Sequence, residues 1–148
     1  MTLREKINDD VKSAMRSGDT ARRDTIRLLL AALKQREVDE RKTLSDADVL
    51  GVIEKMIKQR RDSISQFEQG GRQDLADKEK QELALLQDYM PQAMGEDELA
   101  AAVSAAVAET GASGPADMGK VMAVLKSKLA GRADMSRVSA AVKAQLTR

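Results

Sequence analysis

The 148-residue sequence predicts an all-α protein, with a four-helix N-terminal unit over residues 1–91 and a small three-helix domain over residues 92–148. Three observations lead to this fold class. Apolar residues recur three or four positions apart along seven stretches. Glycine, proline and helix-capping residues separate these stretches. No stretch alternates apolar and polar residues with a period of two, so no strand is predicted.

The first two predicted helices form a pair near the N-terminus. The first has apolar residues four apart: Leu3, Ile7, Val11 and Met15. Gly18 ends it, and Asp19 is placed to cap the second helix. The second helix has apolar residues on a wide face: Ile26, Leu28, Leu29, Leu30 and Leu33. Such a wide face favours a position between several neighbouring elements.

The third predicted helix begins at a capping box, formed by Ser45 and, three residues later, Asp48. Its apolar side is long: Val49, Val52, Ile53, Met56, Ile57, Ile64 and Phe67. Gly70 and Gly71 end it. The fourth helix has fewer apolar residues: Leu75, Leu83, Leu86 and Met90. Pro91 ends this helix because proline cannot continue the hydrogen-bond ladder.

The segment over residues 91–95 is the predicted domain boundary. Before it the chain is rich in Leu, Ile and Arg, whereas after it Ala and Val dominate. A fifth helix follows, ends at Gly111, and has four apolar positions: Leu99, Val103, Ala106 and Val107.

The sixth predicted helix lies within residues 115–131 and has the densest pattern in the chain. Pro115 suits a first helical position, and Asp117 suits the first turn, where the helix dipole favours an anion. Its apolar stripe is regular: Met118, Val121, Met122, Leu125 and Leu129. Gly119 costs a helix about 1 kcal/mol relative to alanine. Its presence therefore predicts that another group approaches the backbone there.

Gly131 is predicted to end the sixth helix in the left-handed conformation. Asp134 is placed to cap a seventh helix, whose apolar residues are Met135, Val138, Val142 and Leu146.

The composition excludes most catalytic chemistry. The chain has no Cys, His or Trp, and one Phe and one Tyr. Disulfides, thiolate nucleophiles, His-based catalytic triads and the commonest metal ligands are therefore absent. We predict no catalytic residue, no metal site and no cofactor, and no enzymatic activity of the isolated chain. The charged start and the lack of an 18-residue apolar stretch predict a cytoplasmic protein with no membrane partner.

Two clusters suggest ligand binding and have simpler explanations. The loop over residues 111–114 precedes a helix as a phosphate loop would, but no strand precedes it and no Walker Lys-Ser/Thr pair follows. Lys55, Lys58 and Arg61 point away from the apolar stripe of the third helix, as on a solvated face. Arg60 lies within that stripe, which favours a structural salt bridge over a ligand contact.

Positive charge gathers near the C-terminus. From residue 117 to residue 148 there are two acids and seven basic residues: Lys120, Lys126, Lys128, Arg132, Arg137, Lys143 and Arg148. This net charge of +5 suits contact with a phosphate backbone. The scarcity of aromatic residues disfavours base stacking, so recognition of a folded RNA by its shape is the preferred nucleic-acid model. A solvated surface on a small Ala-rich bundle remains the alternative.

Several segments resemble a known family. The runs DMGKVM (117–122), LAGRAD (129–134) and VSAAVKAQL (138–146) are similar to the C-terminal tail domain of the GatB subunit of the glutamine-dependent Asp/Glu-tRNA amidotransferase. The runs RLLLAALKQREVDER (27–41) and IKQRRDSISQFEQGGRQDLADKEKQELALLQDYMP (57–91) resemble the free-standing YqeY-like proteins of the GatB/YqeY family.

The resemblance implies a two-part helical fold and contact with tRNA. In the amidotransferase the tail domain lies against the outer corner of the tRNA, around its D-loop. The matching positions in this chain are Asp117, Gly119, Lys120, Gly131, Arg132 and Asp134. Of these, Lys120 and Arg132 bring positive charge and are the implied RNA contacts. Met135 stands where many members have Gly, which favours a helix that starts directly at Asp134.

The leading hypothesis is a non-catalytic accessory module that binds tRNA or similar RNA through Lys120, Lys126, Lys128, Arg132, Arg137 and Lys143. Protein partners of tRNA metabolism are the other implied class of partner. A second hypothesis is a protein–protein adaptor that docks a helix on the leucine face of the second helix and at Gly119. A third is a component of a glutamine-dependent amidotransferase, whose carbon–nitrogen ligase activity would be a family label only.

Overall fold

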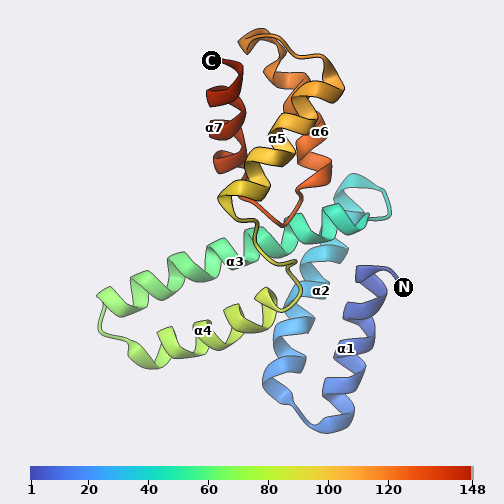
Figure 1. Ribbon diagram of the computed structural model, residues 1–148. Helices are drawn as coiled ribbons and strands as arrows, with labels where there is room; N and C mark the ends of the chain where they lie inside the picture. The colour runs from blue at the N-terminus through green and yellow to red at the C-terminus, as the bar shows by residue number, and fades with distance from the viewer. Residues whose placement is uncertain (148) are drawn as a thin grey trace. The chain divides into compact units, whose positions relative to one another are not determined.

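The computed structural model describes residues 1–147, and every regular element in that range is a helix, which confirms the all-α prediction (Figure 1). Arg148, counted above among the basic residues, lies outside the described residues. The elements are α1 (Leu3–Ser17), α2 (Thr20–Glu40), α3 (Asp46–Gln69), α4 (Gln73–Gln87), α5 (Glu96–Thr110), a short 3₁₀ helix η1 (Pro115–Asp117), α6 (Met118–Lys128) and α7 (Met135–Leu146).

The chain divides into two compact units between Met90 and Pro91. Unit 1 comprises α1 to α4, and unit 2 comprises α5 to α7 with η1. Each unit has its own cluster of buried apolar side chains. That the two units are separate domains, over residues 1–91 and 92–148, stays a prediction.

In unit 1 the helix ends predicted from capping residues are confirmed. Gly18 ends α1 with a left-handed φ of 75°, and the Asp19 carboxylate accepts the N–H of Arg22 at the start of α2. Ser45 and Asp48 form the expected capping box at the start of α3. The end of α4 differs, because this helix stops at Gln87 and does not reach Met90. Residues 88–90 form a tighter turn, since the residue before a proline avoids helical conformation.

The helix α2 lies at the centre of unit 1, where it contacts α1, α3 and α4. This confirms the expectation that its wide apolar face lies between neighbours. Leu29 and Leu33 are fully buried. Leu28, however, remains 49% exposed, so the apolar face extends beyond the core.

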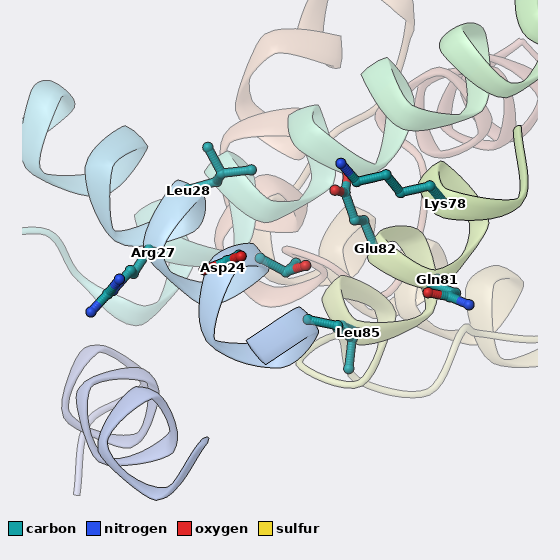
Figure 2. Close-up of a pocket in the computed structure, with 9 residues that line it drawn as sticks. Asp24, Arg27, Leu28, Lys78, Gln81, Glu82 and Leu85 are labelled. Carbon is teal, nitrogen blue, oxygen red and sulfur yellow. The ribbon is translucent and has the colours of Figure 1, made fainter. Parts of the chain in front are cut away.

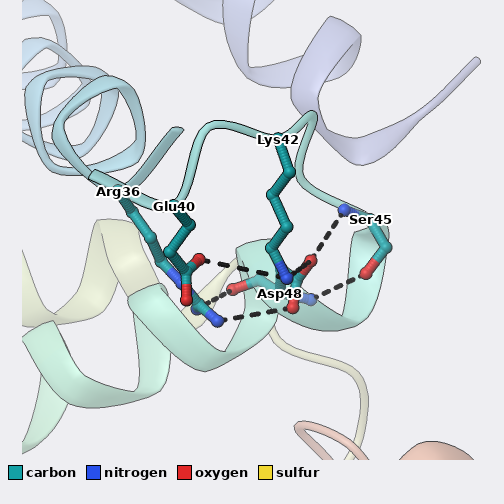
Figure 3. Close-up of polar contacts among 5 residues, drawn as sticks. All are labelled: Arg36, Glu40, Lys42, Ser45 and Asp48. Carbon is teal, nitrogen blue, oxygen red and sulfur yellow. Dashed lines mark hydrogen bonds and ion pairs between the residues drawn. The ribbon is translucent and has the colours of Figure 1, made fainter. Parts of the chain in front are cut away.

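Besides their apolar packing, α2 and α3 are joined by polar contacts (Figure 3). The Arg36 guanidinium donates to the Asp48 carbonyl at 3.2 Å and to the Asp48 carboxylate at 3.4 Å. The Ser45 backbone N–H lowers the pKa of the Asp48 carboxyl below its usual range, and Lys42 adds to this effect. A capping residue of α3 therefore also anchors the last turns of α2.

The arginine inside the α3 stripe forms the predicted structural salt bridge. Arg60 Nε lies 3.1 Å from a carboxylate oxygen of Glu79 and 2.9 Å from one of Glu82, both on α4. All three side chains are mostly buried. Neither oxygen is aligned with the N–H as in a hydrogen bond, so the contact is ionic. It joins the two helices of the α3–α4 hairpin.

We expect Arg60→Met to lower the free energy of unfolding by about 1–2 kcal/mol, because Glu79 and Glu82 are left facing each other without a cation. Glu79→Gln in the Arg60→Met background should restore part of the loss. Denaturant unfolding of both single variants and the double variant measures this coupling. Strictly additive effects would show that the pair does not stabilise the hairpin.

The one tyrosine of the chain fastens the end of unit 1 to α1. The Tyr89 hydroxyl donates to the Asp10 carboxylate at 2.6 Å, and the Lys6 amine lies 5.7 Å from the centre of the ring. Burial, and then the hydrogen bond to Asp10, raise the pKa of Tyr89 well above its ordinary value. The neutral phenol therefore contributes stability that is fully present below pH about 10 and lost as pH rises through the folded-state pKa.

Absorbance titration tests this directly, because no other tyrosine contributes. We expect a midpoint above pH 10 in the folded protein and near 10 in denaturant. Asp10→Asn should lower the folded-state midpoint but leave it raised, since burial remains the larger cause. Asp9→Asn, an exposed neighbour on α1, is the matched control. Equal midpoints for the two variants would refute the assignment to Asp10.

Candidate nucleic-acid interface

The turn between α6 and α7 contains the family motif over residues 129–134. Gly131 has a left-handed φ of 76°, as predicted, but α6 ends earlier, at Lys128. The turn is tight because the Arg132 N–H donates to the Leu129 carbonyl at 3.0 Å, and both Leu129 and Ala133 are buried. Asp134 accepts the N–H of Ser136 at 2.8 Å, which confirms that it caps α7.

Arg132 holds the segment that leads into α5. Its carbonyl accepts the Met94 N–H at 3.0 Å, and its Nε donates to the Gln92 carbonyl at 3.2 Å. The same guanidinium pairs with Glu98 at 2.9 Å. These contacts give the matched motif residue Arg132 a structural role within unit 2.

Arg137 makes a second set of contacts to the same segment. Its Nε and one terminal nitrogen lie 3.1 and 2.7 Å from one oxygen of Glu96. Its other terminal nitrogen donates to the Met94 carbonyl at 3.0 Å. A charged group that forms three such bonds is more constrained than a freely solvated side chain.

The four predicted lysines differ in how far acids neutralise them. Lys128 forms a 2.7 Å ion pair with Glu109 of α5. Lys120 lies 3.9 Å from Asp117, at the limit of an ion pair, and its side chain is 70% exposed. Lys126 and Lys143 are exposed and pair with no carboxylate among residues 1–147.

Asp117 organises the loop before α6. Its carboxylate accepts the Ser113 backbone N–H at 3.0 Å. This hydrogen bond lowers the pKa of Asp117, and the nearby Lys120 ammonium lowers it further. Asp117 is therefore a stable anion that holds the 113–117 turn.

The acids of α5 offset most of the positive charge of the basic C-terminal segment. From residue 91 onward the sequence has seven basic and six acidic residues, a net charge of +1. Glu96, Glu98 and Glu109 are the partners that sequence reasoning missed. The cluster of acids at residues 96–98 was the available signal, but acids in a first helical turn are ordinary. Only spatial placement shows that they face Arg132 and Arg137.

The expectation that a group approaches Gly119 is wrong for the described residues, because a Cβ built there would meet no atom within 4 Å. Gly119 faces outward, as do Ala123 and Ser127 one and two turns later. Lys120 and Lys126 lie on either side of this strip, by helical spacing. The outer face of α6 is therefore smooth, and amines flank it.

Neither a metal site nor a membrane span is found within residues 1–147. No three acidic side chains in that range gather closely enough to hold a metal ion. No helix there is both long enough and apolar enough to cross a bilayer.

Comparison with known proteins gives the family. Residues 4–146 match the model of the family described as Yqey-like protein. The chain belongs to this family.

Named relatives come from yeasts and are called altered inheritance of mitochondria protein 41, mitochondrial. The protein of Vanderwaltozyma polyspora is 42% identical over 85 residues, which are 57% of this chain and 46% of the relative. That of Eremothecium gossypii is 41% identical over 85 residues, again 57% of this chain and 46% of the relative. That of Lachancea thermotolerans is 35% identical over 74% of this chain and 60% of the relative. The aligned region thus spans about half the length of the first two relatives.

We expect Arg137→Ala to lower the free energy of unfolding by about 1–2 kcal/mol, because Glu96 and the Met94 carbonyl lose their donors. Lys126→Ala, on an exposed and unpaired side chain, should change it by less than about 0.5 kcal/mol. Urea unfolding of the two variants compares these roles. Equal midpoints would show that Arg137 does not hold the segment before α5.

Proposed function

We propose that this YqeY-family protein is a non-catalytic accessory module that binds folded RNA, with tRNA as the first candidate, through unit 2. The observation that supports the proposal most is the pair of exposed amines, Lys120 and Lys126, that flank the smooth face of α6, together with the exposed amine of Lys143 on α7. Lys120, Lys126 and Lys143 extend into solvent with weak or no acid pairing. Such amines gain the most from displacing the counterions of a phosphate backbone.

The shape of this face suits an RNA backbone. Gly119, Ala123 and Ser127 have no bulky side chain, so a sugar–phosphate chain could approach the helix closely. No aromatic side chain lies in unit 2 to stack on a base. Contact with phosphates and 2′-hydroxyls, which report the shape of RNA, is therefore the mode that these residues favour.

The six basic residues divide into two groups under this proposal. Lys120, Lys126 and Lys143 make the contacts. The other three are paired with acids of α5: Lys128 with Glu109, Arg132 with Glu98 and Arg137 with Glu96. They add to binding only through the long-range electrostatic field of unit 2. The near-neutral charge of unit 2 predicts modest affinity, as for a module that works beside a larger RNA-binding partner.

We further propose a cytoplasmic location for this chain. The mitochondrial location belongs to the names of the yeast relatives, which are longer than the region they share with this chain.

Titration with tRNA at two salt concentrations tests the RNA proposal. We expect the Lys120→Ala/Lys126→Ala/Lys143→Ala variant to bind more weakly at low salt. For this variant, the slope of log affinity against log salt concentration should be shallower than that of the parent protein. The difference should be about 0.9 for each phosphate that the variant no longer neutralises.

The matched control removes three exposed cations from unit 1, with Lys12→Ala, Lys58→Ala and Arg61→Ala, and carries the same change in net charge. It should retain the slope of the parent protein. If both triple variants bind tRNA with the same affinity and slope, the amines of unit 2 are not the contact surface.

A further inference from the structure

The helix α2 presents a second, exposed seam on the side away from the core of unit 1. The exposed positions alternate in steps of three and four: Ala21, Asp24, Leu28, Ala31, Gln35 and Val38. This is the spacing of the contact positions in a pair of packed helices. Leu28 is 49% exposed and Val38 is 62% exposed, so apolar surface lies open on a helix whose opposite side is already packed.

Grooves border this seam along both halves of α2. A groove of about 420 Å³ lies between α2 and α4, where Leu28, Leu85 and Ala21 supply its apolar lining (Figure 2). A second groove, of about 590 Å³, lies between α2 and α3 and includes Val52 and Met56. A helix laid on the α2 seam would also reach the α3–α4 hairpin, and so would bury more apolar area than α2 alone offers.

Every carboxylate that lines the two grooves already has an ion-pair or hydrogen-bond partner within unit 1. Asp24 pairs with Arg23, and Glu82 pairs with Arg60. Asp39 accepts the Gln35 amide at 2.9 Å, and Glu40 pairs with Arg36 at 2.8 Å.

The cations of the same region are different. Lys55 and Lys78 line the grooves and form no ion pair with a carboxylate within residues 1–147. Arg27 lines one groove too, and it donates to the Met15 sulfur at 3.9 Å. Lys34, exposed beside the seam one heptad after Arg27, is likewise without an acid partner in that range. Four cations around the seam thus lack an acid partner in the described part of the chain, against one carboxylate, Asp39, whose partner is the neutral Gln35 amide, so the unpaired charge is positive on balance.

We propose that this seam, with the grooves beside it, docks an acidic amphipathic helix of a partner protein. The apolar residues of that helix would recur at 3.5-residue spacing and pack on Leu28, Ala31 and Val38. Its Glu or Asp side chains would pair with Arg27, Lys34 and the lysines of the α3–α4 hairpin. This mode of recognition, a helix laid in an apolar groove, is common among interaction modules.

Two other occupants fit the observations less well. A second copy of the chain that paired α2 with α2 would bring its own unpaired Arg27 and Lys34 to the same seam, where like charges repel. An RNA backbone would satisfy the cations but would leave Leu28 and Val38 in contact with water or phosphate, with no gain from their apolar surface.

The probes for the test are two 28-residue peptides of four heptads, identical at the apolar seam positions. One has Glu at the flanking positions, and the other has Lys. Repulsion between flanking charges keeps each peptide from pairing with itself. Fluorescence anisotropy with the full chain should show that the Glu peptide binds at least about tenfold more tightly than the Lys peptide at low salt. Equal binding, or no binding of the Glu peptide, overturns the proposal.

Variants locate the contact. Leu28→Ala should lower the affinity for the Glu peptide by about tenfold, and Lys34→Glu should lower it by about fivefold. Lys12→Glu makes the same charge change at an exposed position on α1 and should leave binding within about twofold. Leu28 and Lys34 are both at the surface, and circular dichroism checks that each variant is folded. If Lys12→Glu and Lys34→Glu weaken binding equally, the seam is not the site.

The same variants decide between the alternative occupants. If Leu28→Ala and Lys34→Glu weaken tRNA binding but not peptide binding, the surface serves nucleic acid and the proposal is wrong. If sedimentation shows a dimer that Leu28→Ala dissociates, the occupant is a second copy, and the proposal is again wrong. The RNA proposal for unit 2 stands or fails separately, because it depends on Lys120, Lys126 and Lys143.

Discussion

Pairing of arginine with carboxylates that are distant in sequence determines which charges of this protein are left for other molecules. Arg60 joins α3 to α4 through Glu79 and Glu82. Arg132, in the turn before α7, and Arg137, on α7, pair with Glu98 and Glu96 of α5 and also bond the segment before that helix. A guanidinium is suited to this role because it is always charged and can form several directed bonds at once. Lysines, with a single hydrated amine, make up most of the unpaired set on α6, α7 and the exposed side of α2.

Both units show this separation of roles between arginines and lysines. In each unit the arginines next to the core are neutralised, so the core is not weakened by unpaired charge. The exposed lysines that remain then act at the surface, where their attraction for an anion is screened by salt and adjustable. A protein with net charge +1 can in this way present locally positive surfaces without a basic composition.

Local features of the fold could be predicted from the sequence, because their physical causes lie within a few residues. The capping box of Ser45 and Asp48, the left-handed glycines 18 and 131, and the cap at Asp134 are of this kind. The partners of Arg132 and Arg137 could not be predicted, since Glu98 and Glu96 lie 34 and 41 positions away. Gly119 was misleading for a related reason. Its cost to the helix is local, but whether another group covers it depends on the whole unit.

The hydrogen bond between Tyr89 and Asp10 has a spectroscopic consequence. The chain has no tryptophan, so its near-ultraviolet emission comes from this one phenol. An excited phenol is a much stronger acid than one in the ground state, and a carboxylate at 2.6 Å offers a ready acceptor for its proton. Emission should therefore be quenched while α1 and the end of unit 1 are joined, and it should brighten when they separate. The protein thus contains a native fluorophore that reports the integrity of unit 1 without any label.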